Sequence, residues 1–332
     1  MKLLCGIFIA FAVLMVNGCA ITKITQDKQS ESERANTMFD EMYMEQLRRS
    51  PELQTSLGIK WDYDKWDNLT EAYVRETHEL HKAQLARLSR LDPAKLDEKT
   101  LISYRLFRQN LENAIADFKW RDHDYPVNQM FGVHSNVPSL LVNQHRVASV
   151  EDAEAYIARL NAVPALFDQL IEGLDRRAAK GIIVPEFIIP YVIRDCRNII
   201  TGAPFEEGGN SVLLADFHKK VYGLDMTEDQ RQRLLGEAVS ALAQKVEPAY
   251  RKLIAELESL ARRADARAGV WKLPEGDAFY AVALQRTTTT GLSPGEIHDI
   301  GLKEVARIHE EMRTIMKQVE FEGELQDFFE YM

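Results

Sequence analysis

The feature that most constrains the fold is a helical spacing of mostly apolar residues that repeats along almost the whole chain. In the clearest two stretches, such side chains recur at intervals of three and four positions, which places them on one face of an α-helix. These residues are Leu69, Tyr73, Thr77, Leu80, Gln84, Leu88 and Leu91, then Leu101, Tyr104, Phe107, Leu111, Ile115 and Phe118. The spacing therefore predicts two long amphipathic helices, separated at Asp92-Pro93.

Helix start and stop residues extend this pattern. Ser149 and Asp152 have the spacing of a capping box, with Asp in place of Glu, and predict the start of a helix that ends before Gly181. Pro164 is expected to kink that helix. A further helix should contain Cys196.

The second half of the chain follows the same rules. Residues 227–268 predict one long helical stretch that Pro248 either kinks or divides into two antiparallel pieces. Ser293, Pro294 and Glu296 combine an N-cap, a first-turn proline and a capping-box acid, so they predict a helix that runs to about Val319.

Strand signals are scarce. Residues 132–142 and 203–210 are the main stretches without helical spacing, and prolines and glycines mark them as loops that could line a cleft. The prediction is an all-α, multi-helix domain of roughly eight to eleven long amphipathic helices, some of them kinked by proline.

The amino terminus predicts export. Lys2 precedes the apolar stretch 3–16, which has the length of a signal-peptide core and is too short to span a bilayer. The following Val16-Asn17-Gly18-Cys19 resembles a bacterial lipobox, whose cysteine becomes acylated. More than one acyl chain at Cys19 would anchor the protein stably in a membrane. Ala20 is not the aspartate of an inner-membrane retention signal, so we expect the outer membrane, facing the periplasm.

The alternative at this end is an ordinary secretory signal that is cleaved near the same position. Under the lipoprotein hypothesis, residues 1–18 are the signal peptide, residues 19–32 form a polar, flexible tether, and residues 33–332 form the helical domain.

Charge and cysteine content exclude other classes. Lys and Arg number 41 against 51 Asp and Glu, a net charge of −10, which is the wrong sign for a general nucleic-acid binder. After the loss of Cys5 with the signal and the acylation of Cys19, Cys196 is the remaining cysteine, so no intrachain disulfide is expected. No neighbouring pattern supplies a histidine base, so we expect Cys196 to be a buried, inert thiol.

The sequence contains no complete catalytic motif. His78 and His81 lie at i, i+3, but Lys82 occupies the second ligand position of a His-Glu-x-x-His zinc motif, and Arg313 does so after His309. There is no Gly-x-Ser-x-Gly, no phosphate loop and no dinucleotide fingerprint. The four threonines 287–290 should be extended, and they either cap the next helix or face a ligand. We therefore assign no metal ligand, cofactor or catalytic residue within this chain.

Several motifs together resemble the domain of unknown function family 885. They are residues 280–286, the threonines 287–290, Gly291-Leu292-Ser293-Pro294, Glu296-Ile297-His298, residues 301–302, 304–308 and 311–312, residues 149–160, residues 167–169 and residues 181–185. The resemblance covers most of residues 35–332. It implies a largely helical fold, frequent occurrence as bacterial lipoproteins, and a suspected zinc-dependent peptidase activity.

That activity depends on an element this chain lacks. Full-length members are longer and carry a His-Glu-x-x-Pro-Gly-His element further along, whereas this sequence ends at residues 326–332 in the middle of an apolar pattern. We therefore expect the chain to be the amino-terminal portion of a longer lipoprotein, incomplete at its carboxyl end and inactive alone.

Two functional hypotheses follow. In the first, the chain supplies cleft walls to a zinc hydrolase that acts on peptides, and the candidates for substrate contact are Tyr280, Arg286, Thr288 and His298. In the second, it is a non-enzymatic, lipid-anchored helical binding module that recognises its partner through loops 126–145 and 203–210.

Overall fold

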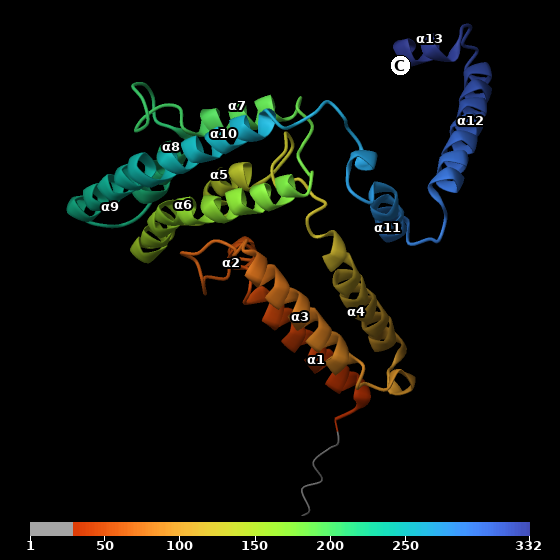
Figure 1. Cartoon of the computed structure of the whole chain (residues 1–332), viewed down its shortest axis with the longest axis horizontal. Helices are drawn as coiled ribbons and strands as arrows, with labels where there is room; N and C mark the ends of the chain where they lie inside the picture. Colours follow the sequence, from red (N-terminus) through yellow and green to blue (C-terminus); the bar gives the residue numbers. More distant parts are fainter. Residues whose placement is uncertain (1–28) are drawn as a thin grey trace, which may run out of the picture.

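The computed structural model describes residues 29–332, and it confirms the all-α class predicted from the apolar spacing (Figure 1). Within these residues there is no β-strand, only two isolated bridges, Val127 with Gly132 and Ala203 with Asn210. The predicted signal peptide, Cys19 and most of the predicted tether fall on residues 1–28, outside the described part.

The first helices form an N-terminal unit with its own small core. They are α1 (Glu31–Leu47), α2 (Pro51–Ser56), α3 (Glu71–Leu88) and α4 (Glu98–Asp117), with 3-10 turns at Pro93–Lys95 and Phe118–Trp120. The buried residues of this core are Ala35, Met42, Leu88, Leu91, Tyr104 and Leu111. The two helices predicted on either side of Asp92-Pro93 are therefore confirmed as α3 and α4.

The helical domain begins slightly earlier than the predicted boundary at residue 33. Helix α1 starts at Glu31, because Ser30 and Glu33 form a reciprocal capping box. The boundary at residue 33 relied on apolar spacing, and this cap contains no apolar residue.

The central bundle contains the main core. Its helices are α5 (Val133–Asn143), α6 (Val150–Ala179), α7 (Ile189–Ile199), α8 (Val212–Tyr222), α9 (Glu228–Ala241) and α10 (Glu247–Ala261). Helix α6 runs through the middle and contacts α5, α9 and α10. As predicted, α6 starts after Ser149, whose hydroxyl accepts a hydrogen bond from the Asp152 amide, and it ends before Gly181. It is continuous across Pro164.

The prediction of a loop at residues 132–142 is wrong, because most of these residues form helix α5. Pro138 led to that prediction, since a proline inside a helix leaves the carbonyl of residue i−4 without its usual donor. Here that carbonyl belongs to His134, and it accepts a hydrogen bond of 2.6 Å from the buried Tyr250 hydroxyl of α10 instead. A tertiary contact thus replaces the missing helical bond. The predicted loop 203–210 is confirmed.

Pro248 does not divide the helix between 227 and 261. A π-helical turn at Leu242–Val246 joins α9 to α10, and the Glu247 amide bonds the Leu242 carbonyl five residues back. The wider turn accommodates the proline at the second position of α10. The two pieces continue one another without a break from Glu228 to Ala261, and both pack against α6.

The last helices form a C-terminal arm beside the bundle: α11 (Gly276–Thr288), α12 (Pro294–Gln318) and α13 (Leu325–Tyr331), preceded by a 3-10 turn at Val270–Lys272. The capping box of Ser293 and Glu296 starts α12 as predicted, and the helix ends one residue before Val319. The short helices α2 and α13 were not anticipated from the spacing. Across residues 29–332, no helix is both long and apolar enough to cross a bilayer.

Candidate functional site

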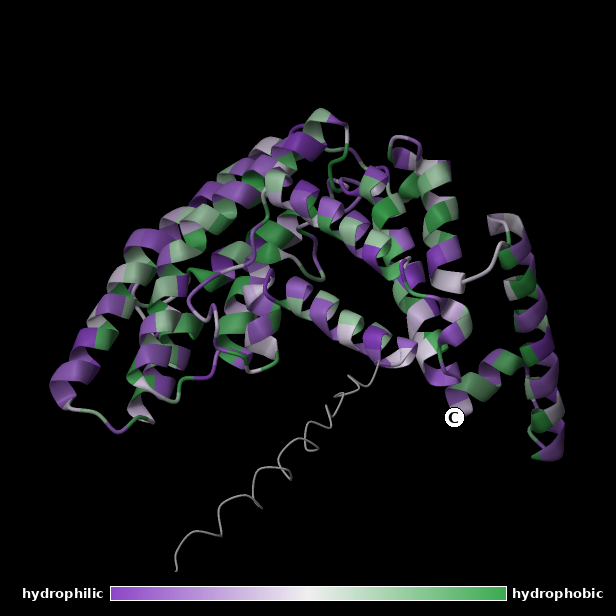
Figure 2. Cartoon of the chain, turned by 90° about the horizontal axis from the view of Figure 1, so that it is seen from below, coloured by the Kyte–Doolittle hydropathy of each residue, from purple (hydrophilic) through white to green (hydrophobic). Residues whose placement is uncertain are grey.

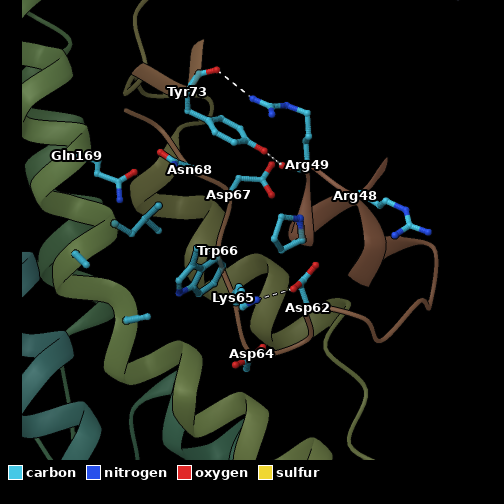
Figure 3. Close-up of a pocket in the computed structure, with 14 residues that line it drawn as sticks. Arg48, Arg49, Asp62, Asp64, Lys65, Trp66, Asp67, Asn68, Tyr73 and Gln169 are labelled. Carbon is cyan, nitrogen blue, oxygen red and sulfur yellow. Dashed lines mark hydrogen bonds and ion pairs between the residues drawn. The ribbon is translucent and has the colours of Figure 1, made fainter. Parts of the chain in front are cut away.

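One hollow, here called the main cavity, lies between the N-terminal unit and helix α6 (Figure 3). Its volume is about 450 Å³, within the range of small-ligand sites. The lining comes from the end of α1, the segment 62–68, Tyr73 of α3 and residues 162–169 of α6. Distant parts of the sequence therefore build this cavity.

A buried arginine fixes the segment beneath the cavity. The Arg159 guanidinium of α6 is fully buried and donates hydrogen bonds to the Lys65 carbonyl at 3.0 Å and to Thr55 Oγ1 at 2.6 Å. In return, Trp66 Nε1 donates to the Arg159 carbonyl at 2.9 Å. These bonds satisfy a charge that would otherwise be costly to bury, and they place the Trp66 ring in the cavity wall.

A neutral histidine completes this buried network. His145 Nδ1 accepts a hydrogen bond from Arg159 Nη1 at 3.1 Å, and its Nε2 donates to the Asp152 carbonyl at 2.9 Å. Burial lowers the pKa of His145 to about 4, and neighbouring Arg159 and Lys220 oppose the charged form further. His145 is therefore a structural neutral imidazole near pH 7.

Most charges in the main cavity are already paired within the chain. Lys65 Nζ lies 2.7 Å from Asp62 Oδ1. Asp67 accepts hydrogen bonds from Ser50 Oγ at 2.7 Å and from the Glu52 amide at 3.0 Å. These carboxylates therefore organise the start of α2 and the segment 62–68.

Arg49 is held in place as well. It donates to the Tyr73 carbonyl at 3.2 Å and to Thr77 Oγ1 at 2.9 Å, and its guanidinium stacks over the Tyr73 ring. The Tyr73 hydroxyl donates back to the Arg49 carbonyl at 2.6 Å. Glu76 also pairs with Arg49, at 3.7 Å, so contacts within the chain hold this cation in the lining of the cavity.

A second cavity of about 220 Å³ shares Asn68 and Gln169 with the main cavity. Its wall contains an ion-pair cluster in which Glu71 of α3 contacts Arg121 at 3.1 Å and Arg176 of α6 at 3.7 Å. This cluster adds an ionic link between the N-terminal unit and α6, and Trp66 and Leu69, between α2 and α3, also pack into the core of the central bundle.

The predicted substrate-contact residues lie elsewhere, on the arm. Arg286 pairs with Asp117 of α4 at 3.2 Å, and Thr288 Oγ1 donates to the Leu284 carbonyl at 2.8 Å. Tyr280 of α11 and His298 of α12 are exposed. None of the four lines the main or second cavity, and their contact with a substrate stays a prediction.

The expectation that threonines 287–290 are extended is wrong for the first two of them. Thr287 and Thr288 form the last turn of α11, and Thr289 follows as its C-cap in the left-handed region, with φ of 56°. Thr290 Oγ1 accepts a weak bond of 3.4 Å from the Leu292 amide. Thr287, Thr288 and Thr289 therefore end α11, whereas the cap of α12 is Ser293.

Of the two predicted recognition loops, 126–145 is not a loop throughout, because it contains helix α5. Loop 203–210 borders a third cavity of about 460 Å³ through Glu206. The rest of that lining comes from α7, α10 and the residues after α7, including Arg197, Arg251 and Glu258. Arg197 and Glu258 already pair at 3.2 Å.

The zinc that the family resemblance implies does not fit the residues described. Among residues 29–332, no group of three or more His, Cys, Asp and Glu side chains is placed to hold a metal ion. The His78 ring instead stacks on Phe118, with ring centroids 3.9 Å apart. Cys196 is fully buried, and burial raises the pKa of its thiol to about 12, as expected for an inert thiol.

The residues that line the main cavity were not predicted from the sequence. A usable signal was present: between two helices, residues 62–68 contain three aspartates, two aromatic rings, a lysine and an asparagine. A short loop so rich in polar and aromatic residues is a candidate binding segment. Its partners on α6 could not be identified, because they follow about a hundred residues later.

Two solved structures share this fold. A candidate lipoprotein from Colwellia psychrerythraea matches with a TM-score of 0.75 and 20% identity, over 89% of this chain and 53% of that chain. A candidate lipoprotein of unknown function from Shewanella oneidensis matches with a TM-score of 0.59 and 16% identity, over 87% and 48%. This chain therefore spans about half the length of both.

The family comparison is more specific than the structural one, since identities at this level establish the fold alone. A search of curated proteins found no match. The model of the family described as "bacterial protein of unknown function (DUF885)" matches residues 51–332, which is most of the chain. The chain therefore belongs to the DUF885 family.

Proposed function

We propose that this protein is a lipid-anchored component of the bacterial cell envelope, attached through acylated Cys19 to the outer membrane and facing the periplasm. The observation that carries the proposal is the shared fold with a candidate lipoprotein over 89% of the chain. The apolar stretch 3–16 followed by Val16-Asn17-Gly18-Cys19 supports it independently.

The anchor is tested by Cys19→Ser, examined by membrane fractionation in a bacterial host. The variant should move from the membrane pellet to the soluble fraction, because two acyl chains are needed for stable anchoring. Cys196→Ser is the matched control and should stay with the membrane. Retention of Cys19→Ser in the membrane would contradict the proposal.

The helical domain is further proposed to be the ligand-binding, amino-terminal half of a zinc-dependent hydrolase. Its support is the match to about half of each solved chain, together with the main cavity between the N-terminal unit and α6. A bound zinc would supply an activated water. The residues of this chain would bind and orient the ligand, since the described donors do not fit the ion.

This part of the proposal predicts that the purified chain neither retains zinc stoichiometrically nor cleaves peptides. Zinc is measured by elemental analysis after gel filtration, and cleavage by mass spectrometry of a mixed peptide pool. One tightly held zinc per chain would refute the proposal that this chain binds the ligand but does not hold the metal.

The second candidate is a non-enzymatic, lipid-anchored binding module. The observation that favours it is the cavity beside loop 203–210, because Glu206 of that loop takes part in the lining. The genomic reading frame beyond Met332 distinguishes the two: a downstream His-Glu-x-x-Pro-Gly-His favours the hydrolase, and an immediate stop codon favours the module.

A further inference from the structure

Arg48 and Asp64 differ from the other charged side chains that line the main cavity. In the part of the chain that the structure describes, neither Arg48 nor Asp64 makes an ion pair or a side-chain hydrogen bond, whereas the other charged side chains in the lining do. Arg48 lies only above the Trp61 ring, 5.4 Å from its centroid. Both side chains are exposed, and both line the main cavity. The lining can therefore pair with one negative and one positive group of a ligand.

The side-chain amides of Asn68 and Gln169 add hydrogen-bond donors of fixed orientation. Asn68 Oδ1 accepts hydrogen bonds from the Thr70 amide at 3.0 Å and from Thr70 Oγ1 at 2.7 Å, and Gln169 Oε1 accepts one from the Leu69 amide at 2.7 Å. These bonds fix the orientation of both amides, because only the oxygen can accept. Within residues 29–332, neither NH₂ group has an acceptor, so both are available to carbonyl oxygens of a ligand.

The wall between these groups is apolar and includes two small side chains. It is formed by Pro51, Trp66, Ala162, Ala165 and Leu166. The two alanines of α6 leave room, and the hydrogen bond to Arg159 holds the largely buried Trp66 ring in the cavity wall. A ligand here therefore also gains from one apolar side chain.

We propose that the main cavity binds short peptides with both termini free. The terminal carboxylate pairs with Arg48, the terminal ammonium pairs with Asp64, the NH₂ groups of Asn68 and Gln169 donate to peptide carbonyls, and one apolar side chain packs on Trp66. This names the ligand class of the proposed binding half and so rests on that function.

The test is isothermal titration of the detergent-solubilised whole chain with Ala-Leu-Ala. The free tripeptide should bind, and acetylating its amino end or amidating its carboxyl end should each weaken binding about two- to fivefold, as expected for the loss of one exposed ion pair. In Asp64→Asn, acetylation should make no further difference, and in Arg48→Gln amidation should make none. Asp229→Asn, on the surface of α9, is the control and should bind like the unmodified chain.

Three outcomes would overturn the inference: no heat of binding for the free tripeptide, equal binding of blocked and free peptides, or equal binding of free leucine, which lacks peptide carbonyls. Binding that is unchanged in both Asp64→Asn and Arg48→Gln would also overturn it, since the peptide would then occupy another place. Membrane release of Cys19→Ser is read separately, so a failed anchor and a failed peptide site are distinguishable.

Discussion

Helices α6 and α12 begin in the same way and end in very different surroundings. In each, an N-cap serine accepts a hydrogen bond of 3.3 Å from the amide three residues on, Ser149 from Asp152 and Ser293 from Glu296. Thirteen of the 30 residues of α6 are buried, whereas Met316 alone is buried among the 25 of α12. Local signals thus set where a helix starts, but the packing partners decide what its apolar face contributes.

The apolar residues of the arm show the same contrast. Figure 2 shows apolar residues along α12, which lies away from the bundle. Its exposed large apolar side chains are Ile300, Leu302, Val305, Ile308 and Ile315. The same kind of residue in α6, such as Leu160 and Phe167, is fully enclosed. Removing a side chain should therefore cost much in α6 and little in α12.

The largest expected effect is that of Phe167→Ala. Phe167 is fully buried and packs edge-to-face against Tyr250, with ring centroids 4.8 Å apart. The substitution should lower the free energy of unfolding by about 3–5 kcal/mol, because it removes transfer energy and leaves a cavity. Val305→Ala in α12 is the matched control and should change it by less than about 0.5 kcal/mol. Urea unfolding followed by circular dichroism measures both, and similar losses would contradict the comparison.

The second largest expected effect is a pH dependence of the free energy of unfolding that arises from the buried His145. His145 has a pKa of about 4 when folded, below the ordinary value of 6.5, so the unfolded chain binds more protons between these values. Stability contributed by neutral His145 is complete above pH 6.5 and is lost as the pH falls toward 4. The loss at pH 5 should be on the order of 2 kcal/mol.

Urea unfolding at pH 7 and pH 5 checks this prediction. His145→Gln should reduce the difference between the two pH values by that amount, whereas His218→Gln, on the surface of α8, should leave it unchanged. Carboxylates also respond to pH, but they do so equally in both variants. The same pH dependence in His145→Gln as in the unmodified chain would assign the effect to other groups.

A smaller effect should come from Tyr250→Phe. The lost hydroxyl leaves the buried His134 carbonyl without a donor, which should cost about 1–3 kcal/mol. In Pro138→Ala the restored backbone amide can serve that carbonyl, so the cost of Tyr250→Phe should fall by at least about 0.5 kcal/mol. A double-mutant cycle by urea unfolding measures the coupling, and strict additivity would mean that the tyrosine does not compensate for the proline.

A comparison of α12 with α5 explains which parts of the fold could be predicted from the sequence and which could not. Helix α12 was predictable almost to its ends, because Ser293, Pro294 and Glu296 act within one turn. Helix α5 was not, because its donor to the His134 carbonyl lies more than a hundred residues away on Tyr250. The main cavity was missed for the same reason, since Trp66 and Gln169 meet only after folding. A helix cap formed within one turn can be predicted from the sequence, whereas a hydrogen bond between residues far apart in the chain cannot.

The smallest expected effect concerns the start of α12. Because this helix gains little from packing, its cap should matter locally: Ser293→Ala removes the bond to the Glu296 amide and should cost about 1 kcal/mol of local helix stability. Hydrogen exchange of the first turns of α12 should accelerate about fivefold, which that energy predicts, while exchange in α6 stays unchanged. Ser149→Ala should instead leave exchange in the middle of α6 slow, because thirteen buried residues hold that helix. Equal acceleration along both helices would mean that α12 has packing partners comparable to those of α6, and the contrast between bundle and arm would then fail.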